Sequence, residues 1–501
     1  MFYYDGFGRL EESTSPDGLV KSQTYANNAL VDTMTLRKSG VSESHQFHFD
    51  YDDPLHRLTQ ISQVKADGTT RELQSFGYDD FGNASTLTDK TSSFTNETRR
   101  LFDNLGNLLT EESSLSGAGV RDYTNKVKYA INYVAGFREV QLPDLDNRSR
   151  PVLWNRARYQ SDRAGRHQRL DLDRQPFATQ ANLGQQPVST AIKEAGFTKT
   201  AQLSPWLEVT NLRVAAFQGI FAATFDYHLD NSGRVLATRF QTQDPAVERT
   251  TFFEHDAYGA VVGEGSVERF EPLPIQAWFT ATTNSTSPTY WRMSHRDYDQ
   301  VENLCRAYRK IGPGGPDSPE QTVHEVFYSS APPQEDLRKL SSAALASAKS
   351  DQLRTIVSKA GIPEQLDYDY RGQLRGYRAY EGTNAYQWQL TYDPLGRLSK
   401  AQKEVAGEHT TVQTLEFAYD ALNRRVLKKV VVHQHTKLQH FGYADGQLAL
   451  VKANGGDPSE PWVVDSQYLW GATPGDLLMA VLSQDAVEHN GEADLKRYYF
   501  H

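Results

Sequence analysis

Cysteine is almost absent from this sequence. Only Cys305 occurs in 501 residues, so no disulfide can form within the chain, and the fold has to hold without covalent cross-links. No run of apolar residues is long enough to span a bilayer. The first residues, Met1–Asp5, lack the basic and apolar regions of a secretory signal peptide.

Positive charge and apolar residues are also scarce. Lys and Arg number 53 against 63 Asp and Glu, which gives a formal net charge of −10. A nucleic-acid surface is therefore not expected, because affinity for phosphates depends on Lys and Arg. Hydrophobic residues make up 38% of the chain, less than in most globular domains. This composition fits a thin wall that is wetted on both faces.

The most informative feature is a repeated heptad, first seen as Tyr4-Asp5-Gly6-Phe7-Gly8-Arg9-Leu10. Tyr favours strands, and Asp accepts the local backbone hydrogen bonds that begin a turn. Gly or Asn four positions after Tyr tolerates the positive φ of a tight turn, and Arg-Leu starts the return strand. Further copies begin at Tyr51, Tyr78, Phe102, Tyr298, Tyr368, Tyr392 and Tyr419.

The spacing of the copies is regular. Intervals of 24 and 27 residues separate Tyr51, Tyr78 and Phe102, and they recur from Tyr368 to Tyr443. Such a period marks an array of small units, none of which buries its apolar face alone. Each unit is interpreted as a β-hairpin with strands about 33 Å long at ~3.3 Å per residue. The sequence thus predicts an all-β fold, an array of hairpin repeats in a long curled sheet with a small helical insert.

The heptads resemble the YD repeats of the Rhs family, which includes polymorphic-toxin shells, Tc toxin B and C components, wall-associated bacterial proteins and animal teneurins. Near the end, Gln467–Gly471 and Arg497–His501 are similar to the segment that leads into the Rhs core. The resemblance implies that the sheet spirals into a hollow shell around a toxic polypeptide, with this chain as part of the wall. It implies no catalytic residue here, because the family's self-cleaving aspartates lie beyond the matching region.

The repeat rhythm predicts five segments. Residues 1–128 form a YD-repeat block, 129–226 a divergent β region with faint copies, and 227–311 a stretch of degenerate repeats. Residues 312–363 form a loop and helical-hairpin insert, and 364–501 a second YD-repeat block that runs into the core-like segment. Because the heptads begin at once and the core-like segment breaks off, we expect a piece of a longer polypeptide or a separately expressed half of a shell.

Two local expectations concern the breaks in the rhythm. Alternating apolar and polar residues over 207–214 predict a half-buried strand. Helical spacing of apolar residues predicts a helical hairpin that packs outside the sheet, plugs an opening or docks a partner. The first helix carries Leu337, Leu340, Ala344 and Leu345, and the second carries Leu353, Ile356, Val357 and Ala360 before Gly361 and Pro363.

Candidate chemical sites are weak. His433 and His435 on one predicted strand, with His440 near, suggest a metal site, but they lack a fixed Asp or Cys partner and are more typical of surface or partly buried aromatics. The segment Asp144–Asn147 lacks the glycine and glutamate of a calcium loop, and Gly312–Pro316 lacks the lysine of a phosphate loop.

Other residues that suggest chemistry have simpler interpretations. Cys305 lies inside a repeat copy, where a small buried thiol is expected. Asn96 and Asn284 begin glycosylation tripeptides, which are common by chance. The heptad Asp always precedes a turn, and the Tyr ladder stabilises a sheet by ~0.2–1 kcal/mol per cross-strand pair. We predict no catalytic, cofactor or metal-binding residue.

The function predicted is that of a structural shell segment of an Rhs/YD-repeat toxin, which encloses and helps to deliver a toxic C-terminal polypeptide. Its partners would be that cargo and other shell or secretion-apparatus components, and the chain would be secreted or delivered by a dedicated secretion system. The alternative is an extracellular or cell-surface module whose Tyr faces bind carbohydrate or protein. An enzyme hidden in residues 129–226 comes third.

Overall fold

The chain forms strands along its length, and every regular element among the described residues is a β-strand. This confirms the predicted all-β fold. The computed structural model describes residues 1–499 except for internal gaps. The gaps are 16–17, 27–28, 66, 118–122, 144–153, 163–165, 174, 184–185, 193–196, 205, 207, 217–220, 244–245, 257–258, 270–289, 299–303, 313–320, 330–354, 359–362, 382–383, 409, 434, 457–461, 471–476 and 484–494.

The strands fall into three groups along the chain. The first is β1 Phe2–Tyr4, β2 Leu10–Thr14, β3 Leu19–Tyr25, β4 Val31–Lys38, β5 Ser44–Asp50, β6 Gln60–Val64, β7 Thr70–Tyr78, β8 Ala84–Asp89, β9 Phe94–Phe102, β10 Leu108–Gly117 and β11 Tyr123–Asn132. The second is β12 Phe137–Gln141, β13 Arg156–Ser161, β14 His167–Leu172, β15 Gln175–Leu183, β16 Gln186–Ile192, β17 Phe197–Leu203, β18 Val209–Ala216, β19 Phe221–Leu229, β20 Val235–Gln243, β21 Ala246–His255, β22 Val261–Arg269, β23 Tyr290–Tyr298, β24 Leu304–Gly312, β25 Gln321–Ser329 and β26 Thr355–Ser358. The third is β27 Pro363–Tyr368, β28 Leu374–Glu381, β29 Asn384–Tyr392, β30 Leu398–Val405, β31 Thr410–Tyr419, β32 Arg425–Val432, β33 His435–Ala444, β34 Gln447–Asn454, β35 Val463–Trp470, β36 Leu477–Ser483 and β37 Leu495–Tyr499.

The topology is a meander of hairpins. Neighbours along the chain pair antiparallel, as β7 does with β8 and β31 with β32. The heptad turns join an odd-numbered strand to the next even one, so within one run of paired strands they lie at the same strand ends. The register shifts beside the heptad Tyr, for example between Gly77 and Tyr78 and between Ala418 and Tyr419. The heptad therefore encodes a β-bulge as well as a turn.

Two compact units divide the chain. The first contains residues Met1–Tyr133, Arg138–Ala157 and Leu366–His501, and the second contains Val134–Phe137 and Arg158–Gln365. Within the first unit, we call residues 1–133 the first block and residues 366–499 the last block.

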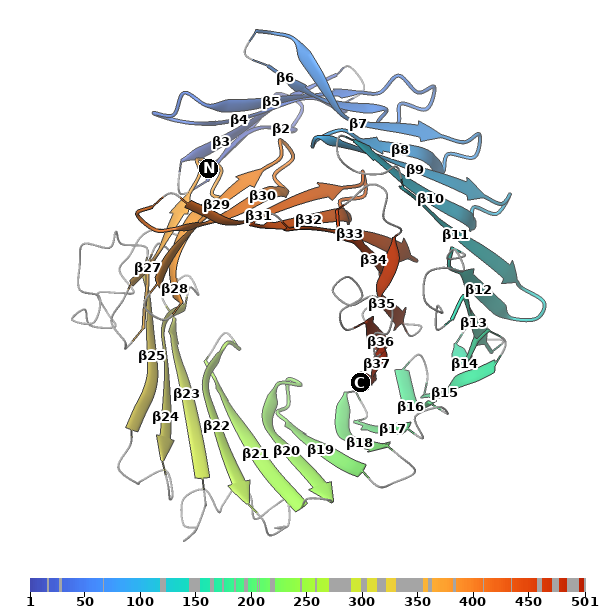
Figure 1. Ribbon diagram of the computed structural model, residues 1–501, viewed down its shortest axis with the longest axis vertical. Helices are drawn as coiled ribbons and strands as arrows, with labels where there is room; N and C mark the ends of the chain where they lie inside the picture. Colours follow the sequence, from blue (N-terminus) through green and yellow to red (C-terminus); the bar gives the residue numbers. More distant parts are fainter. Residues whose placement is uncertain are drawn as a thin grey trace. The chain divides into compact units, whose positions relative to one another are not determined.

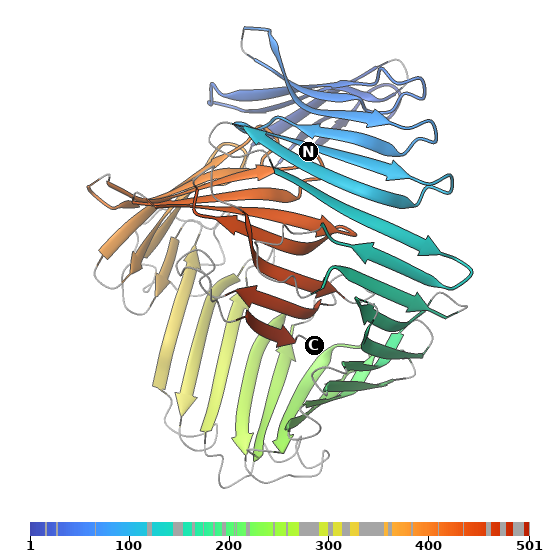
Figure 2. The ribbon, with the colours of Figure 1, turned by 45° about the vertical axis from the view of Figure 1, so that its right-hand side comes forward.

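In the first unit the two blocks pack face to face as two layers. Strands β31–β34 lie against β9–β11 in both ribbon views (Figures 1 and 2). Along β11, Tyr123, Asn125, Val127 and Tyr129 are buried and alternate with exposed neighbours, so one face of this strand is the interface. The core contains residues of both blocks, namely Phe94, Leu115, Tyr123, Ala418, Val426, Leu427, Leu438 and Trp462.

The second unit is strand-rich, including the region whose heptads are faint. Strands β13–β19 occupy most of its first half, and the strand expected at 207–214 is present as β18. Its buried apolar residues include Leu170, Phe177, Ala178, Ile192, Ala222, Ala223 and Ala237.

The predicted second helix of the insert is wrong where it can be seen. Ile356 and Val357 belong to β26, which pairs with β25 and with β27, and Pro363 begins β27. The first predicted helix, with Leu337 and Leu345, lies outside the described residues. A short apolar run fits both a helix and a strand, and strand pairing decides between them. No helix of the described chain is long and apolar enough to cross a membrane.

Gly106 tests the backbone requirement of the heptad turn. Its φ is +80°, and a Cβ added there would meet only ordinary contact with Asn83. Gly106→Ala should therefore lower the free energy of unfolding by about 1–2 kcal/mol through backbone strain alone. Gly106→Asn should cost clearly less, because Asn423 holds the same turn position at φ 63°. Urea unfolding of the two variants measures this; equal losses would contradict it.

Candidate functional site: the heptad turns and the seam between two layers

Each heptad turn is closed by hydrogen bonds around its Asp. In the turn after β7, Asp79 Oδ1 accepts the backbone N–H groups of Phe81 at 3.0 Å and Asn83 at 2.8 Å. Where an Arg stands at the Asn83 position, its Nε donates to the second oxygen, as Arg397 does to Asp393 at 2.7 Å. Turns of this kind carry Asp5, Asp53, Asp79, Asp103, Asp162, Asp230, Asp369, Asp393 and Asp420.

The list includes one copy that the sequence shows only faintly. Asp162 accepts both the backbone N–H of Arg166 at 2.9 Å and its Nε at 2.7 Å. The divergent region therefore retains the turn chemistry of the heptad. The copy that begins at Tyr298 has its turn outside the described residues.

Solvent exposure decides how the turn carboxylate titrates. The hydrogen bonds from the Arg57 side chain lower the pKa of Asp53 to about 2. In Asp420, whose residue is fully buried, the loss of hydration raises the pKa above its usual value even though Arg424 opposes the shift. Asp420 is thus more strongly dehydrated than Asp53, although both hold the same position in their heptads.

Tyr and Arg of the heptad link each repeat to its neighbour. The Tyr78 hydroxyl donates to the Leu58 carbonyl of the preceding repeat at 2.8 Å, and the Arg57 guanidinium lies 4.2 Å from the Tyr78 ring centroid. In the last block, the Tyr443 hydroxyl donates to the Arg425 carbonyl at 2.8 Å, and Arg424 covers its ring at 4.9 Å. These tyrosines are therefore occupied within the sheet.

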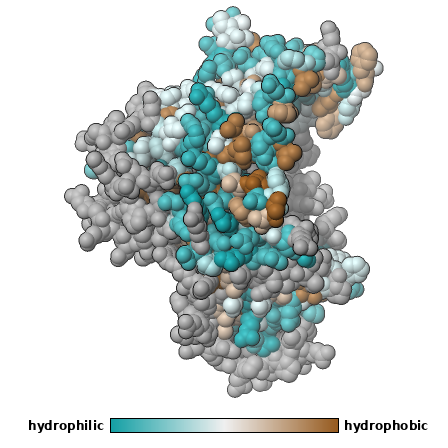
Figure 3. Space-filling model, turned by 90° about the vertical axis from the view of Figure 1, so that its right-hand side faces the viewer, coloured by the Kyte–Doolittle hydropathy of each residue, from teal (hydrophilic) through white to brown (hydrophobic). Residues whose placement is uncertain are grey.

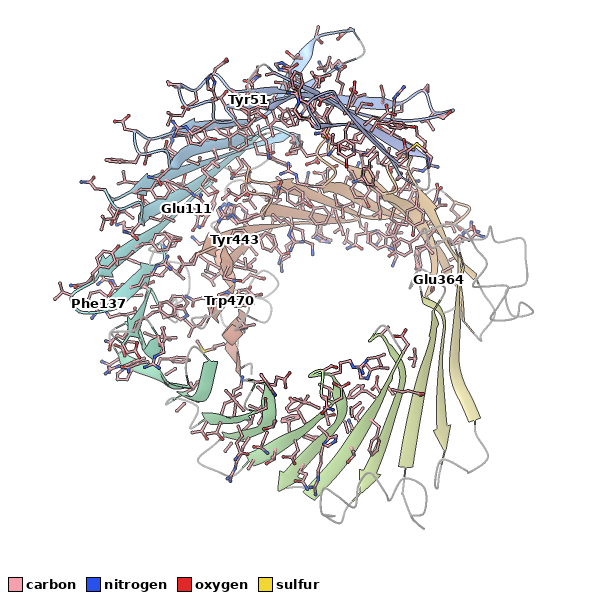
Figure 4. The ribbon with its side chains drawn as sticks, turned by 180° about the vertical axis from the view of Figure 1, so that it is seen from behind. Tyr51, Glu111, Phe137, Glu364, Tyr443 and Trp470 are labelled. Carbon is pink, nitrogen blue, oxygen red and sulfur yellow. The ribbon has the colours of Figure 1, made fainter. Side chains whose placement is uncertain are left out.

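The heptad turns of the last block also contact the first block. Arg397 Nη2 lies 2.9 Å from Asp89 Oδ2, and Arg424 Nη2 lies 2.9 Å from Glu111 Oε1. Figure 4 shows Glu111 and Tyr443 on the facing sides of the two layers. We call this row of contacts the seam. Its further members are Tyr370 with His45, Asp445 with Tyr129 and Arg138, and Gln467 with the Trp154 carbonyl.

The ion pairs of Arg397 and Arg424 in the seam are buried and shared. The Glu111 side chain is 6% exposed and also accepts Arg100, with Nη2 at 2.7 Å. The Asp89 side chain is 1% exposed and also accepts Gln74 at 2.7 Å and the Thr91 hydroxyl at 2.6 Å. Each of these two carboxylates therefore has more than one partner, which offsets the cost of removing it from water. Asp89 and Glu111 lie outside the heptad, so the motif gives no signal for them.

A buried cluster of aromatic and basic side chains lies farther along the seam. The centroid of the Tyr123 ring, on β11, lies 4.1 Å from that of His440 and 5.3 Å from that of Trp462. The Lys452 Nζ atom lies 5.0 Å from the Tyr123 centroid. Burial lowers the pKa of His440 to about 3, helped by the Lys452 charge, and that of Lys452 to about 8. The cluster is buried and aromatic, and it holds two basic side chains whose pKa values are lowered by that burial.

The structure separates the three histidines of the weak metal pattern. His433 is exposed in the turn between β32 and β33 with a positive φ of 53°, not on a strand as expected, and His435 is exposed at the start of β33. His440 is buried in the cluster. In the part of the chain that the structure describes, no three His, Cys, Asp or Glu residues are arranged to hold a metal ion.

The other candidate residues add no site. Asn96 is buried in β9 at 1% exposure, which does not suit a glycosylation acceptor. Cys305 lies in β24, and Gly312 ends the same strand. Asp144–Asn147, 313–316 and Asn284 fall outside the described residues. The absence of a catalytic, cofactor or metal residue stays a prediction.

Fold and turn chemistry together define a class: an antiparallel sheet of hairpin repeats in which each heptad ties its hairpin to the next. The particular likeness is to the solved structure of TcdB2-TccC3, with a TM-score of 0.53, 11% identity and 94% of this chain covered. TcdB2-TccC3 without its hypervariable C-terminal region gives 0.53 and 10%, and the TcdB2-TccC3-Cdc42 complex gives 0.50 and 10%, again over 94% of this chain.

These likenesses show a shared fold. The chain spans about a quarter of the matched chains, at 25%, 24% and 25% of their lengths. No protein-family model matches the sequence, and none of the curated proteins does. The heptads are consistent with the Rhs family at this level.

Glu111 tests the seam. Glu111→Gln removes one charge of a buried network and leaves Arg424 and Arg100 dehydrated, so the free energy of unfolding should fall by about 3–5 kcal/mol. The control is Glu12→Gln, because Glu12 pairs with the largely exposed Arg37, and it should cost less than ~1 kcal/mol. Urea unfolding compares the two. Similar losses in both variants would mean that the seam contributes no more than a surface ion pair.

His440 makes stability depend on pH. Because its pKa in the folded chain is about 3 against ~6.5 when unfolded, only the unfolded chain takes up the proton between these values. His440 should therefore leave stability unchanged above pH 6.5 and lower it below that pH by ~1.4 kcal/mol per pH unit. His440→Phe should remove this slope between pH 6.5 and 4.5 in urea unfolding. An unchanged slope would place the proton uptake elsewhere.

Proposed function

We propose that this chain is a wall segment of a hairpin-repeat shell that encloses a polypeptide cargo, as the Rhs-type resemblance implies. One observation carries the proposal: the heptad side chains hold repeat to repeat and, in the seam, layer to layer. A single residue, Arg397, makes all three kinds of contact. It binds Asp393 in its own turn, covers the Tyr419 ring of the next repeat and pairs with Asp89 of the other layer. This use of the heptad suits a continuous wall without a catalytic site.

The likeness to TcdB2-TccC3 supports the proposal at the level of fold. It covers 94% of this chain, so the resemblance includes the region without clear heptads. The cargo, the delivery of the shell by a secretion system and the assembly with further shell components belong to the proposal. We propose no catalytic role for this chain.

The alternative, a carbohydrate-binding module based on the heptad Tyr faces, has less support. Tyr78, Tyr392 and Tyr419 each donate their hydroxyl to a backbone carbonyl, and Arg guanidinium groups cover Tyr78 and Tyr419. A ring that is covered in this way is not free to stack on a sugar.

Protease protection tests the wall function. The polypeptide that contains residues 1–501 is produced at its natural length and digested with proteinase K, together with the same cargo expressed alone. The cargo should survive inside the wall and be degraded alone. The double variant Arg397→Ala, Arg424→Ala should lose this protection at a lower urea concentration, because both seam ion pairs are removed. Arg234→Ala is the matched control, because Arg234 holds the same heptad position with a side chain that is 43% exposed.

Equal digestion of the cargo with and without the wall would overturn the proposal. Saturable glycan binding by the intact chain, lost on substitution of heptad Tyr residues, would favour the alternative.

A further inference from the structure

The heptad turns of the first block end in exposed apolar side chains. Phe7 is 88% exposed, Leu55 69%, Phe81 70% and Leu105 76%. All four stand at the tips of heptad turns, which the topology places along one edge of the sheet. Apolar side chains gather among hydrophilic ones on the face drawn in Figure 3. We call these four residues the tip row. A row of large apolar tips is an unusual surface for a sheet edge that faces only water.

The last block shows what covers such an edge. Leu395 and Leu422 occupy the same position in their heptads as Phe81 and Leu105, yet they are only partly exposed. Their turns lie on the face of the first block, where Arg397 meets Asp89 and Arg424 meets Glu111. One heptad edge in this molecule is therefore already seated on the face of a hairpin-repeat sheet.

The seating works because the two layers share a period. Successive heptad turns are two strands apart, which is ~10 Å at about 4.8 Å per strand. Their acceptors on the other layer, Asp89 of β8 and Glu111 of β10, are also two strands apart, with Asp89 level with Leu115 and so four residues farther along than Glu111. Each Arg therefore finds a carboxylate after a step of two strands, along a line that crosses the first block obliquely. A partner without this period would satisfy one turn and miss the next.

The heptad turns of the first block also carry Arg side chains. Arg9 uses Nε to bind Asp5 at 2.6 Å, as Arg397 uses Nε to bind Asp393, and Arg397 reaches the other layer with Nη2. Arg57 differs, because its Nε and its Nη2 both bind Asp53, at 2.8 and 2.6 Å. Asn83 and Asn107 replace Arg in the next two turns, so the edge carries charge at one end and amides at the other.

We propose that the tip row docks on the face of a second hairpin-repeat sheet, contributed by a chain segment outside residues 1–501. This sheet would carry an acceptor side chain opposite Arg9 and apolar residues opposite Phe81 and Leu105, whose turns are two strands apart. The inference deepens the proposed wall function and rests on it. The matched chains, of which this chain spans about a quarter, contain further length for such a sheet.

A second copy of this chain is the less suitable occupant. The face that accepts a heptad edge here, with Asp89 and Glu111, is already buried under the last block. Docking through it would require the seam to open.

Hydroxyl-radical labelling tests the docking. The labelling of Phe7, Phe81 and Leu105 is compared between residues 1–501 alone and the native assembly, isolated through a tag on this chain and resolved into its component chains. The tip row should be labelled rapidly in the isolated chain and several-fold more slowly in the assembly. Val41, exposed at the opposite edge of the first block, should be labelled equally in both.

The variant Phe81→Glu, Leu105→Glu should weaken binding of the partner by roughly tenfold or more, because two carboxylates would lose their hydration where apolar side chains were buried. Val41→Glu should leave it unchanged, and the urea midpoints of both isolated variants should match that of the parent chain.

Equal labelling of the tip row in both samples would overturn the docking. So would protection by a second copy, seen as concentration-dependent dimers of residues 1–501 in sedimentation, or by a partner without hairpin repeats. Cargo that is protected from protease while the tip row stays labelled would refute the docking but keep the wall function. If the tip row is protected from labelling while the cargo is digested, the docking is kept and the wall function is refuted.

Discussion

The clamp between a heptad Asp and the backbone N–H groups of its own turn is the interaction on which the other contacts depend. It fixes the turn, and the turn fixes the position of the residue four places after Asp. When that residue is Arg, its guanidinium is held by Nε, which orients the remaining nitrogens. The plane of the guanidinium then covers the Tyr ring of the next repeat, and Nη2 reaches a carboxylate of the opposite layer. A short-range hydrogen-bond pattern is thereby converted into long-range order.

The same residue types have different energetic weight in the two blocks. In the first block the turns are hydrated, and their Asp–Arg pairs resemble surface ion pairs of small net value. In the last block, Asp420 and Arg424 are removed from water and joined to Glu111, so loss of any one member leaves a buried charge without its partner. The Asp–Arg pair of a heptad thus contributes little to stability where it is hydrated, but its loss is costly where it is buried in the seam.

Much of the local structure could be predicted from the sequence. The Tyr, Asp and Gly of the heptad act through neighbours within four residues, so strands, turns and positive φ follow from the motif. The seam could not be predicted, because Asp89 and Glu111 lie outside the motif and meet Arg397 and Arg424 only when residues about 300 positions apart come together. The insert failed for a related reason: strand pairing overrode a local helical spacing at Ile356. His440 was visible as a histidine, but its burial depends on Tyr123 of the other layer.

The shared period of the two layers has a consequence for how such a chain can change length. In the seam, the contacts of both blocks recur every two strands. Inserting one hairpin between two seam contacts in either block would move every later Arg away from its carboxylate, unless the other block gained a hairpin as well. The number of repeats in the two blocks is therefore coupled within the seam, whereas hairpins added outside it leave the contacts aligned. The repeat number of this chain should therefore evolve by paired insertions within the seam and by single insertions beyond it.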